Sequence, residues 1–212
     1  MLKLPDLRLM EEVDSDEDPL KYHRTPLLNR FYFKRLEEAV QLLDHAHYDS
    51  MLDLGYGSGI LLPTLAGYCR KLTAVDIHPK ANVVYKMLER ERVKATLVQA
   101  DVKTMPFPDN YFDAVMCVAI LDHVSPASDS AKEIARVLKR GGVFILGNVV
   151  ENKLTNFAFR LIGAKTHEHH VTPYPKILEA LSERLECEKI IHFPKMTPLP
   201  ISLYLWAKYY KR

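Results

Sequence analysis

Short apolar runs alternate along the chain with segments in which apolar residues recur every three or four positions. The runs predict β-strands over residues 50–54, 72–77, 95–100, 114–120 and 143–147. The segments around them predict helices over 22–43, from about 60, over 79–92, before Gly141 and over 175–185. The run at 114–120 is apolar throughout, which is typical of a central strand in a parallel sheet.

This alternation predicts a single α/β domain in which helices cover both faces of a doubly wound, Rossmann-like sheet. Two more apolar stretches, near 187–193 and 202–209, predict two further strands joined by a proline-rich link. Residues 151–175 are less regular. Ligands of doubly wound sheets bind beyond the carboxyl ends of the strands. We therefore expect the chemistry of this chain at the residues that follow each strand.

An acidic, glycine-rich turn follows the first predicted strand. Gly55, Gly57 and Gly59 alternate with residues that carry side chains, and Asp53 lies two positions before the first glycine. The second strand leads to Asp76, which is 21 residues after Gly55. A strand, a tight glycine turn, a helix and a second strand that ends in a carboxylate form the βαβ unit that binds a nucleoside-bearing cofactor.

The spacing of the glycines argues against three other motifs. A dinucleotide fingerprint has glycines at i, i+2 and i+5, but the last position here is Ile60 or Leu62. This disfavours an NAD-dependent oxidoreductase. No Gly-Lys-Ser/Thr follows, as a phosphate-binding P-loop requires. A nucleophile elbow has a glycine two positions before its serine and another two positions after it. Neither position around Ser58 is a glycine, so Ser58 is not part of a nucleophile elbow. The remaining interpretation is a turn in which the backbone can approach a ligand closely.

Three segments resemble class I S-adenosylmethionine (SAM) dependent methyltransferases of the small-molecule, methyltransferase type 11-like kind. Residues 53–59 resemble motif I of that family. Residues 105–113, Met-Pro-Phe-Pro-Asp-Asn-Tyr-Phe-Asp, are similar to its loop into the fourth strand. Residues 135–142 are similar to its helix-to-strand junction, with Arg140 where proline is common. The resemblance covers roughly residues 50–150 with the motifs in the family's order, and three spaced motifs are more specific than one.

The resemblance implies a seven-stranded, mostly parallel sheet with an antiparallel C-terminal strand, and SAM as the cofactor. Asp76 is expected to accept hydrogen bonds from both ribose hydroxyls. Asp101 and Val102 are implied to contact the adenine, and Asp53 to order the loop or receive the cofactor's ammonium. The full set of expected cofactor-binding residues is Asp53, Gly55, Tyr56, Gly57, Ser58, Gly59, Asp76, Ile77, His78, Asp101, Val102 and Ala119.

Methyl transfer from SAM is an in-line displacement with a neutral thioether leaving group, so positioning is the main task of the protein. A base helps only if the acceptor is a hydroxyl or phenol. His123, after the fourth strand, is the candidate catalytic base, because histidine titrates near neutrality. The other reading is that His123 only lines the methyl-transfer cavity.

The acceptor is expected to meet residues outside the cofactor core. The candidate substrate residues are Tyr22, His23, Tyr32, His167 and His170. Ordinary helix packing is the competing interpretation of the first three. The run His-Glu-His-His that ends at His170 is not a zinc-binding His-Glu-x-x-His, and three scattered cysteines form no metal spacing. We expect no metal site.

Composition limits the partners. The net charge of +2 gives no electrostatic footprint for nucleic acid, and the Asn/Asp-Pro-Pro-Tyr signature of amino-group DNA and protein methyltransferases is missing after the fourth strand. The expected substrate is therefore a small or lipid-like molecule. No apolar run is long enough for stable membrane insertion, and the cysteines indicate reduced thiols and a cytoplasmic location.

Residues 1–19 include an acidic run and are expected to form a flexible arm. Residues 20–212 are expected to form the methyltransferase domain, with the cofactor core at about 50–150 and substrate-side segments at 20–45 and 151–175. A function of another class stays open, namely a catalytically silent SAM-binding protein that regulates a partner, because the sequence contains no certain catalytic base.

Overall fold

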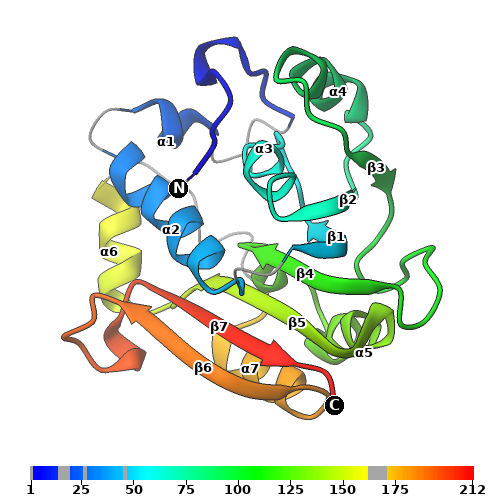
Figure 1. Ribbon diagram of the computed structural model, residues 1–212. Helices are drawn as coiled ribbons and strands as arrows, with labels where there is room; N and C mark the ends of the chain where they lie inside the picture. Colours follow the sequence, from blue (N-terminus) through cyan, green and yellow to red (C-terminus); the bar gives the residue numbers. More distant parts are fainter. Residues whose placement is uncertain (1, 14–19, 26–27, 45–46, 162–170) are drawn as a thin grey trace.

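The computed structural model describes residues 2–13, 20–25, 28–44, 47–161 and 171–212. Its described residues form a seven-stranded sheet in the order β3-β2-β1-β4-β5-β7-β6 (Figure 1). The strands are β1 Tyr48–Leu54, β2 Cys69–Asp76, β3 Thr96–Gln99, β4 Phe112–Val118, β5 Leu138–Val149, β6 Glu186–Phe193 and β7 Tyr204–Tyr210. β7 runs antiparallel to β5 and β6, and the other pairs are parallel. The expected fold class is confirmed.

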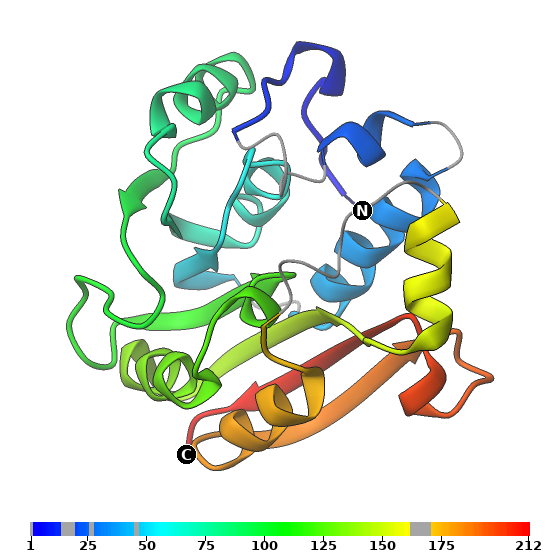
Figure 2. The same cartoon turned by 180° about the vertical axis from the view of Figure 1, so that it is seen from behind.

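Helices cover both faces of the sheet (Figures 1 and 2). They are α1 Leu20–Arg24, α2 Asn29–Gln41, α3 Leu62–Leu65, α4 Ala81–Arg90, α5 Ala127–Val137, α6 Lys153–Leu161 and α7 Tyr174–Ser182, with 3-10 turns η1 Leu7–Leu9, η2 Leu121–His123 and η3 Leu199–Ile201. Side chains alternate across a strand, so Met116 of β4 belongs to the core cluster that includes residues of α2, α3 and α4, and Val115 belongs to the cluster that includes residues of α5 and α7.

Several helices differ from those that the spacing of apolar residues predicted. The helix expected over residues 22–43 is two helices, α1 and α2. Pro26 lies between them in the sequence, and proline cannot donate the backbone hydrogen bond of a continuous helix. The helix expected from about residue 60 is only α3. The irregular segment after β5 contains α6.

The N-terminal arm also needs correction over residues 2–13. The backbone N–H of Lys3 donates to Thr64 Oγ1 at 2.9 Å, and that hydroxyl donates back to the carbonyl of Lys3 at 2.9 Å. Met10 and Val13 are buried in the core that α3 and α4 share. Within residues 2–13 the apolar side chains of Met10 and Val13 are buried, whereas Glu11 stays exposed, so this part of the chain packs on the domain. Residues 14–19 lie outside the described residues.

Candidate cofactor crevice and acceptor site

The glycine turn begins where β1 ends and requires glycine for two reasons. Gly55, Gly57 and Gly59 have φ angles of 73°, 48° and 81°, which residues with a side chain rarely adopt. A Cβ on Gly55 would lie 2.0 Å from Ile120 Cδ1, and one on Gly59 would lie 2.7 Å from Val84 Cγ1. A Cβ on Gly57 would meet nothing within 4 Å, so this side of the turn is open.

Asp76, at the end of β2, holds the turn. Its Oδ2 accepts the backbone N–H of Gly57 at 2.8 Å, and its Oδ1 accepts that of His78 at 3.2 Å. Each carboxylate oxygen has a second lone pair. Asp76 therefore keeps acceptor capacity while it ties the second strand to the turn after the first.

His78 clamps the same turn from the other direction. Its Nε2 lies 3.1 Å from the carbonyl oxygen of Gly57, and its Nδ1 accepts the backbone N–H of Lys80 at 3.1 Å. A carbonyl can only accept, so Nε2 carries the proton and the ring is the neutral tautomer. The Tyr56 ring packs edge-on against the His78 ring at 4.9 Å. His78 therefore contacts two residues of the glycine turn, Tyr56 and Gly57.

Asp53 is a buried acid behind the turn, with 4% of its surface exposed. Burial, and then the nearby charge of Asp76, raise the pKa of Asp53 to about 7. Tyr56 and Ser58 are also buried, and the hydroxyl of Tyr56 has no hydrogen-bond partner among the described residues. The residues around the glycine turn, which we take as the candidate cofactor crevice, therefore include two carboxylates and an unpaired phenol beyond the end of β1.

The residues expected around the adenine follow β2 and β3. Ile77 is 69% exposed, which is unusual for a large apolar side chain at the end of a core strand. Asp101 accepts the backbone N–H of Lys103 at 2.8 Å, and Val102 is buried in the core. Ala119, after β4, has a φ of 58°, and its N–H donates to the carbonyl of Gly147 at 2.7 Å.

Three of the candidate substrate residues lie together in the structure, on what we call the candidate acceptor side. The Tyr22 and Tyr32 rings stack at 5.2 Å, and the buried His23 ring contacts the Tyr32 ring at 5.3 Å. Burial, and then the charge of Arg35, lower the pKa of His23 to about 3, so this imidazole is neutral. His123 lies in η2, with its side chain 28% exposed and its Nε2 4.0 Å from Asp122 Oδ1.

His167 and His170 lie outside the described residues. Two further residues of this side, Arg35 and Tyr204, escaped the sequence analysis. Arg35 Nη2 lies 3.5 Å from the Tyr204 hydroxyl, although 169 positions separate them in the chain. An arginine next to Leu36 on the apolar face of α2 was the one available sign, because charged residues normally occupy the opposite face.

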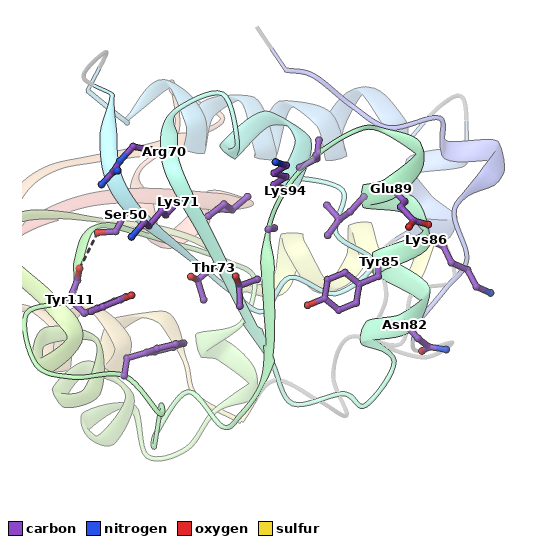
Figure 3. A pocket seen from close by; sticks show the side chains of 16 residues that line it. Ser50, Arg70, Lys71, Thr73, Asn82, Tyr85, Lys86, Glu89, Lys94 and Tyr111 are labelled. Atoms are coloured by element: carbon purple, nitrogen blue, oxygen red, sulfur yellow. Dashed lines mark hydrogen bonds between the residues drawn. The ribbon is translucent and has the colours of Figure 1, made fainter.

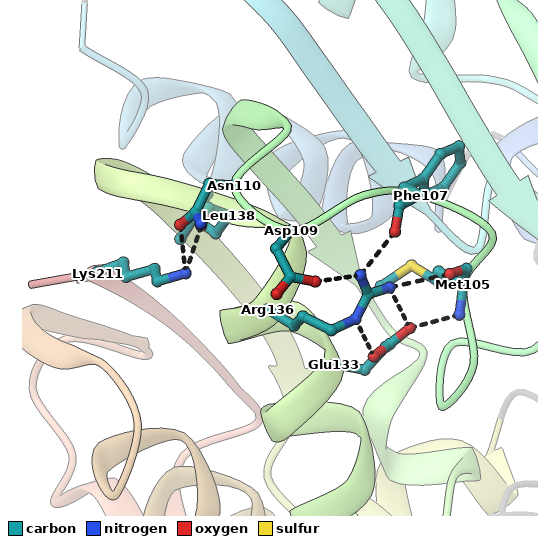
Figure 4. A network of polar contacts seen from close by, with 8 residues as sticks. All are labelled: Met105, Phe107, Asp109, Asn110, Glu133, Arg136, Leu138 and Lys211. Carbon is teal, nitrogen blue, oxygen red and sulfur yellow. Dashed lines mark hydrogen bonds and ion pairs between the residues drawn. The ribbon is translucent and has the colours of Figure 1, made fainter.

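The second and third family-like segments serve to fix the loop before β4 (Figure 4). Arg136 of α5 donates to the carbonyl oxygens of Phe107 and Met105 at 2.6 and 3.0 Å and to Asp109 Oδ1 at 2.8 Å. Glu133 pairs with Arg136 at 2.8 Å and accepts the N–H of Met105 at 2.6 Å. These contacts tie the loop before β4 to α5.

A pocket of about 860 Å³ lies around the edge strand β3, between β2 and α4 (Figure 3). Its lining includes Ser50 and Arg70, near the starts of β1 and β2, together with Lys71, Tyr85 and Lys94. The glycine turn follows the other end of β1. The pocket is therefore separate from the candidate cofactor crevice.

Residues 52–146 match the family model described as a methyltransferase domain. This segment, a little under half of the chain, is therefore similar to a methyltransferase domain. Over 134 residues, the chain is 31% identical to a sterol 4-C-methyltransferase of Caenorhabditis elegans, covering 58% of the chain and 40% of that protein. It is 30% identical over 134 residues to a ubiquinone biosynthesis O-methyltransferase of Alkalilimnicola ehrlichii, covering 62% of the chain and 53% of the relative.

The chain thus spans about half the length of the curated relatives it matches. Its fold resembles the crystal structure of the N-methyltransferase NodS from Bradyrhizobium japonicum in complex with S-adenosyl-L-homocysteine. The TM-score is 0.70 at 18% identity, with 94% of each chain covered. In the described ranges, no helix has the length and apolar character needed to cross a bilayer. Nor do His, Cys, Asp and Glu side chains gather there in a metal-binding group.

Proposed function

We propose that this chain transfers a methyl group from SAM to a small or lipid-like acceptor by in-line displacement. The observation that carries the proposal is the joint placement of Asp76 and the open glycine turn. The carboxylate at the end of β2 lies at hydrogen-bond distance from Gly57, whose other side is free of neighbouring atoms. A nucleoside on that side would have the carboxylate beside its sugar.

The residues present fit SAM. Asp76 has lone pairs for the ribose hydroxyls, and Asp53 can neutralise the ammonium of the methionine tail in a buried site. Ile77 offers the exposed apolar surface that a stacked adenine would cover. Asp101 can accept from the adenine amino group. When bound, SAM supplies an electrophilic methyl on a sulfonium whose departure needs no proton.

In this proposal the protein binds and orients both partners. The glycine turn lets the backbone approach the methionine tail, while Ala119 and Ile120 close the other wall after β4. His123 is proposed to line the methyl-transfer cavity, where it can take a proton from a hydroxyl acceptor. The crevice residues come from residues 50–150, and α1 and α2 supply the acceptor side, which supports a single catalytic domain.

Two observations support a small or lipid-like acceptor. The relatives named above are a sterol methyltransferase and an enzyme of ubiquinone biosynthesis. In addition, Leu154 and Phe157 of α6 and Met196 and Ile201 near η3 are exposed apolar residues, and α6 contacts η3. Apolar surface near the acceptor side favours a substrate with an apolar body.

Calorimetry with SAM, S-adenosylhomocysteine and NAD tests the cofactor assignment, and transfer of radiolabel from SAM to a metabolite extract tests catalysis. We expect SAM and its product to bind and NAD not to bind. Asp76→Ala should weaken SAM binding strongly, whereas Asp49→Ala, an exposed carboxylate at the start of β1, should leave it unchanged. Equal SAM affinity in Asp76→Ala contradicts the site. SAM binding without any transfer favours a regulatory SAM-binding protein.

A further inference from the structure

A buried cation lies on the acceptor side of the sheet. Arg35 of α2 is only 7% exposed. The Tyr32 and Tyr204 rings lie against its guanidinium, with centroids 4.9 and 4.5 Å from Cζ. Its Nη2 donates a long hydrogen bond of 3.5 Å to the Tyr204 hydroxyl, and hydrogen bonding with Arg35 also acts on Tyr32. The two aromatic rings therefore orient the guanidinium, but few of its N–H groups have a hydrogen-bond acceptor.

The guanidinium has unused hydrogen-bonding capacity. It presents five N–H donors, and Nε has no partner among the residues that the structure describes. A buried ionised group without partners costs free energy, so such groups normally meet an anion, ordered water or a ligand. Aromatic rings cover the faces of the planar guanidinium, so its remaining N–H donors lie along its edge. That edge binds oxyanions in a bidentate manner.

The side chains around Arg35 do not supply a negative charge that would balance its guanidinium. Burial raises the pKa of Tyr204 to about 12, and that of Tyr32 also lies above its usual range, so both phenols are neutral at physiological pH. His23 is neutral because burial lowers its pKa to about 3. The charge of Asp122 also raises the pKa of Arg35, after the contributions of burial, Tyr204 and Tyr32. The cluster therefore retains positive potential.

Arg35 also lies close to the candidate cofactor crevice. The Tyr204 hydroxyl is 3.1 Å from the position of a Cβ on Gly147, so it rests against the backbone of β5. The carbonyl of Gly147 accepts from Ala119, and the next residue, Ile120, packs on Gly55 of the turn. One pair of neighbouring strands thus separates the cation from the wall of the crevice.

We propose that Arg35, with the Tyr204 hydroxyl as a second donor, binds an oxyanion of the methyl acceptor. The acceptor is then an acidic molecule, with a carboxylate or phosphate group that anchors it while another atom receives the methyl group. This inference rests on the proposed methyltransferase function, since it takes the ligand of this site to be the acceptor. The neutral Tyr22, Tyr32 and His23 rings form the apolar wall beside the anchored group.

Trp206 offers a direct readout. It is the single tryptophan of the sequence, its Nε1 donates to the Arg35 carbonyl at 2.8 Å, and its ring lies 4.8 Å from that of Tyr204. The experiment follows Trp206 fluorescence during titration with benzoate, phenyl phosphate and neutral benzamide, each with and without S-adenosylhomocysteine. We expect benzoate or phenyl phosphate to give a saturable change and benzamide none, and the preferred anion identifies the acidic group.

Arg35→Met should weaken the preferred anion at least tenfold. Arg30→Met, the same substitution at an exposed site of the same helix, should not. If Arg35→Met fails to fold, Tyr204→Phe, which removes only the second donor, should weaken the anion several-fold. Equal responses to benzoate and benzamide, no anion response in the wild-type protein, or unchanged anion affinity in folded Arg35→Met would overturn the inference.

Calorimetry with SAM on the same samples separates the two proposals. Arg35→Met should keep the SAM affinity of the wild-type protein. If SAM does not bind but benzoate still requires Arg35, the proposed function fails and the anion site stands. If SAM binds and no anion does, the acidic acceptor is rejected and the methyltransferase proposal is unaffected.

Discussion

The Asp76 carboxylate accepts the backbone N–H of Gly57 at 2.8 Å, across 19 positions of the chain. This bond joins the end of β2 to the turn after β1, so the proposed ribose acceptor and the proposed backbone cradle form one unit. The neutral His78 ring reinforces the unit through the Gly57 carbonyl. A change at Asp76 therefore acts on the cofactor in two ways, through a lost acceptor and through a looser turn.

Asp76→Asn should weaken SAM binding about tenfold to a hundredfold. The amide keeps one acceptor oxygen but loses the charge and the second oxygen, and a hydrogen bond to a charged group contributes about 1.5–3 kcal/mol. Calorimetry measures the affinity, and Asp49→Asn at the exposed start of β1 is the matched control. An affinity within twofold of the wild type contradicts the assignment of Asp76.

Alanine substitutions at two glycines should separate folding from binding. Gly55→Ala places a Cβ 2.0 Å from Ile120 at a φ of 73°, so we expect a loss of stability beyond the roughly 1–2 kcal/mol of left-handed backbone strain. Gly57→Ala meets open space, so it should cost only the strain but weaken SAM, because its methyl group points into the proposed site. Denaturant unfolding and calorimetry measure the two effects. Equal stability losses would show that Ile120 does not press on Gly55.

Asp53 should make the stability of the ligand-free protein fall as the pH rises. Its pKa is about 7 in the folded protein, whereas an ordinary aspartate has a pKa of 3.8, so between these values the folded state holds a proton that the unfolded chain has released. The contribution is fully present below pH 3.8 and is lost as the pH passes through 7; it is on the order of a few kcal/mol. Asp53→Asn should therefore gain stability relative to the wild type between pH 5 and pH 8, as measured by urea unfolding. A difference that stays constant with pH would place the Asp53 pKa near its usual value.

Arg136→Met should destabilise the fold with little effect on SAM affinity. The substitution leaves the carbonyls of Met105 and Phe107 without their side-chain donor and Glu133 without its cation (Figure 4). We expect a loss of about 1–3 kcal/mol, reduced by the partial exposure of this network. Arg140→Met, at an exposed position after α5, is the control. A strong loss of SAM affinity at unchanged stability would move this loop into the binding site.

Much of the fold followed from local pattern. The apolar runs marked all seven strands, and the glycine spacing with Asp76 marked the turn, because both signals lie between near neighbours in the chain. Boundaries were less accurate, since the register of a partner strand decides where a strand stops. β5, for example, starts at Leu138 because Leu138 pairs with Phe112.

By itself, the sequence determined the seven strands in their order along the chain, the turn that needs positive φ angles, and the resemblance of three segments to methyltransferase motifs. The tertiary structure alone decided which distant residues meet. It packs residues 2–13 on the core, seats Ile120 on Gly55, holds His78 in one tautomer and buries Arg35 beside Tyr204. The physical reason is range: conformational preferences and periodicity act between chain neighbours, whereas burial and the pairing of charges depend on segments that only the folded sheet brings together.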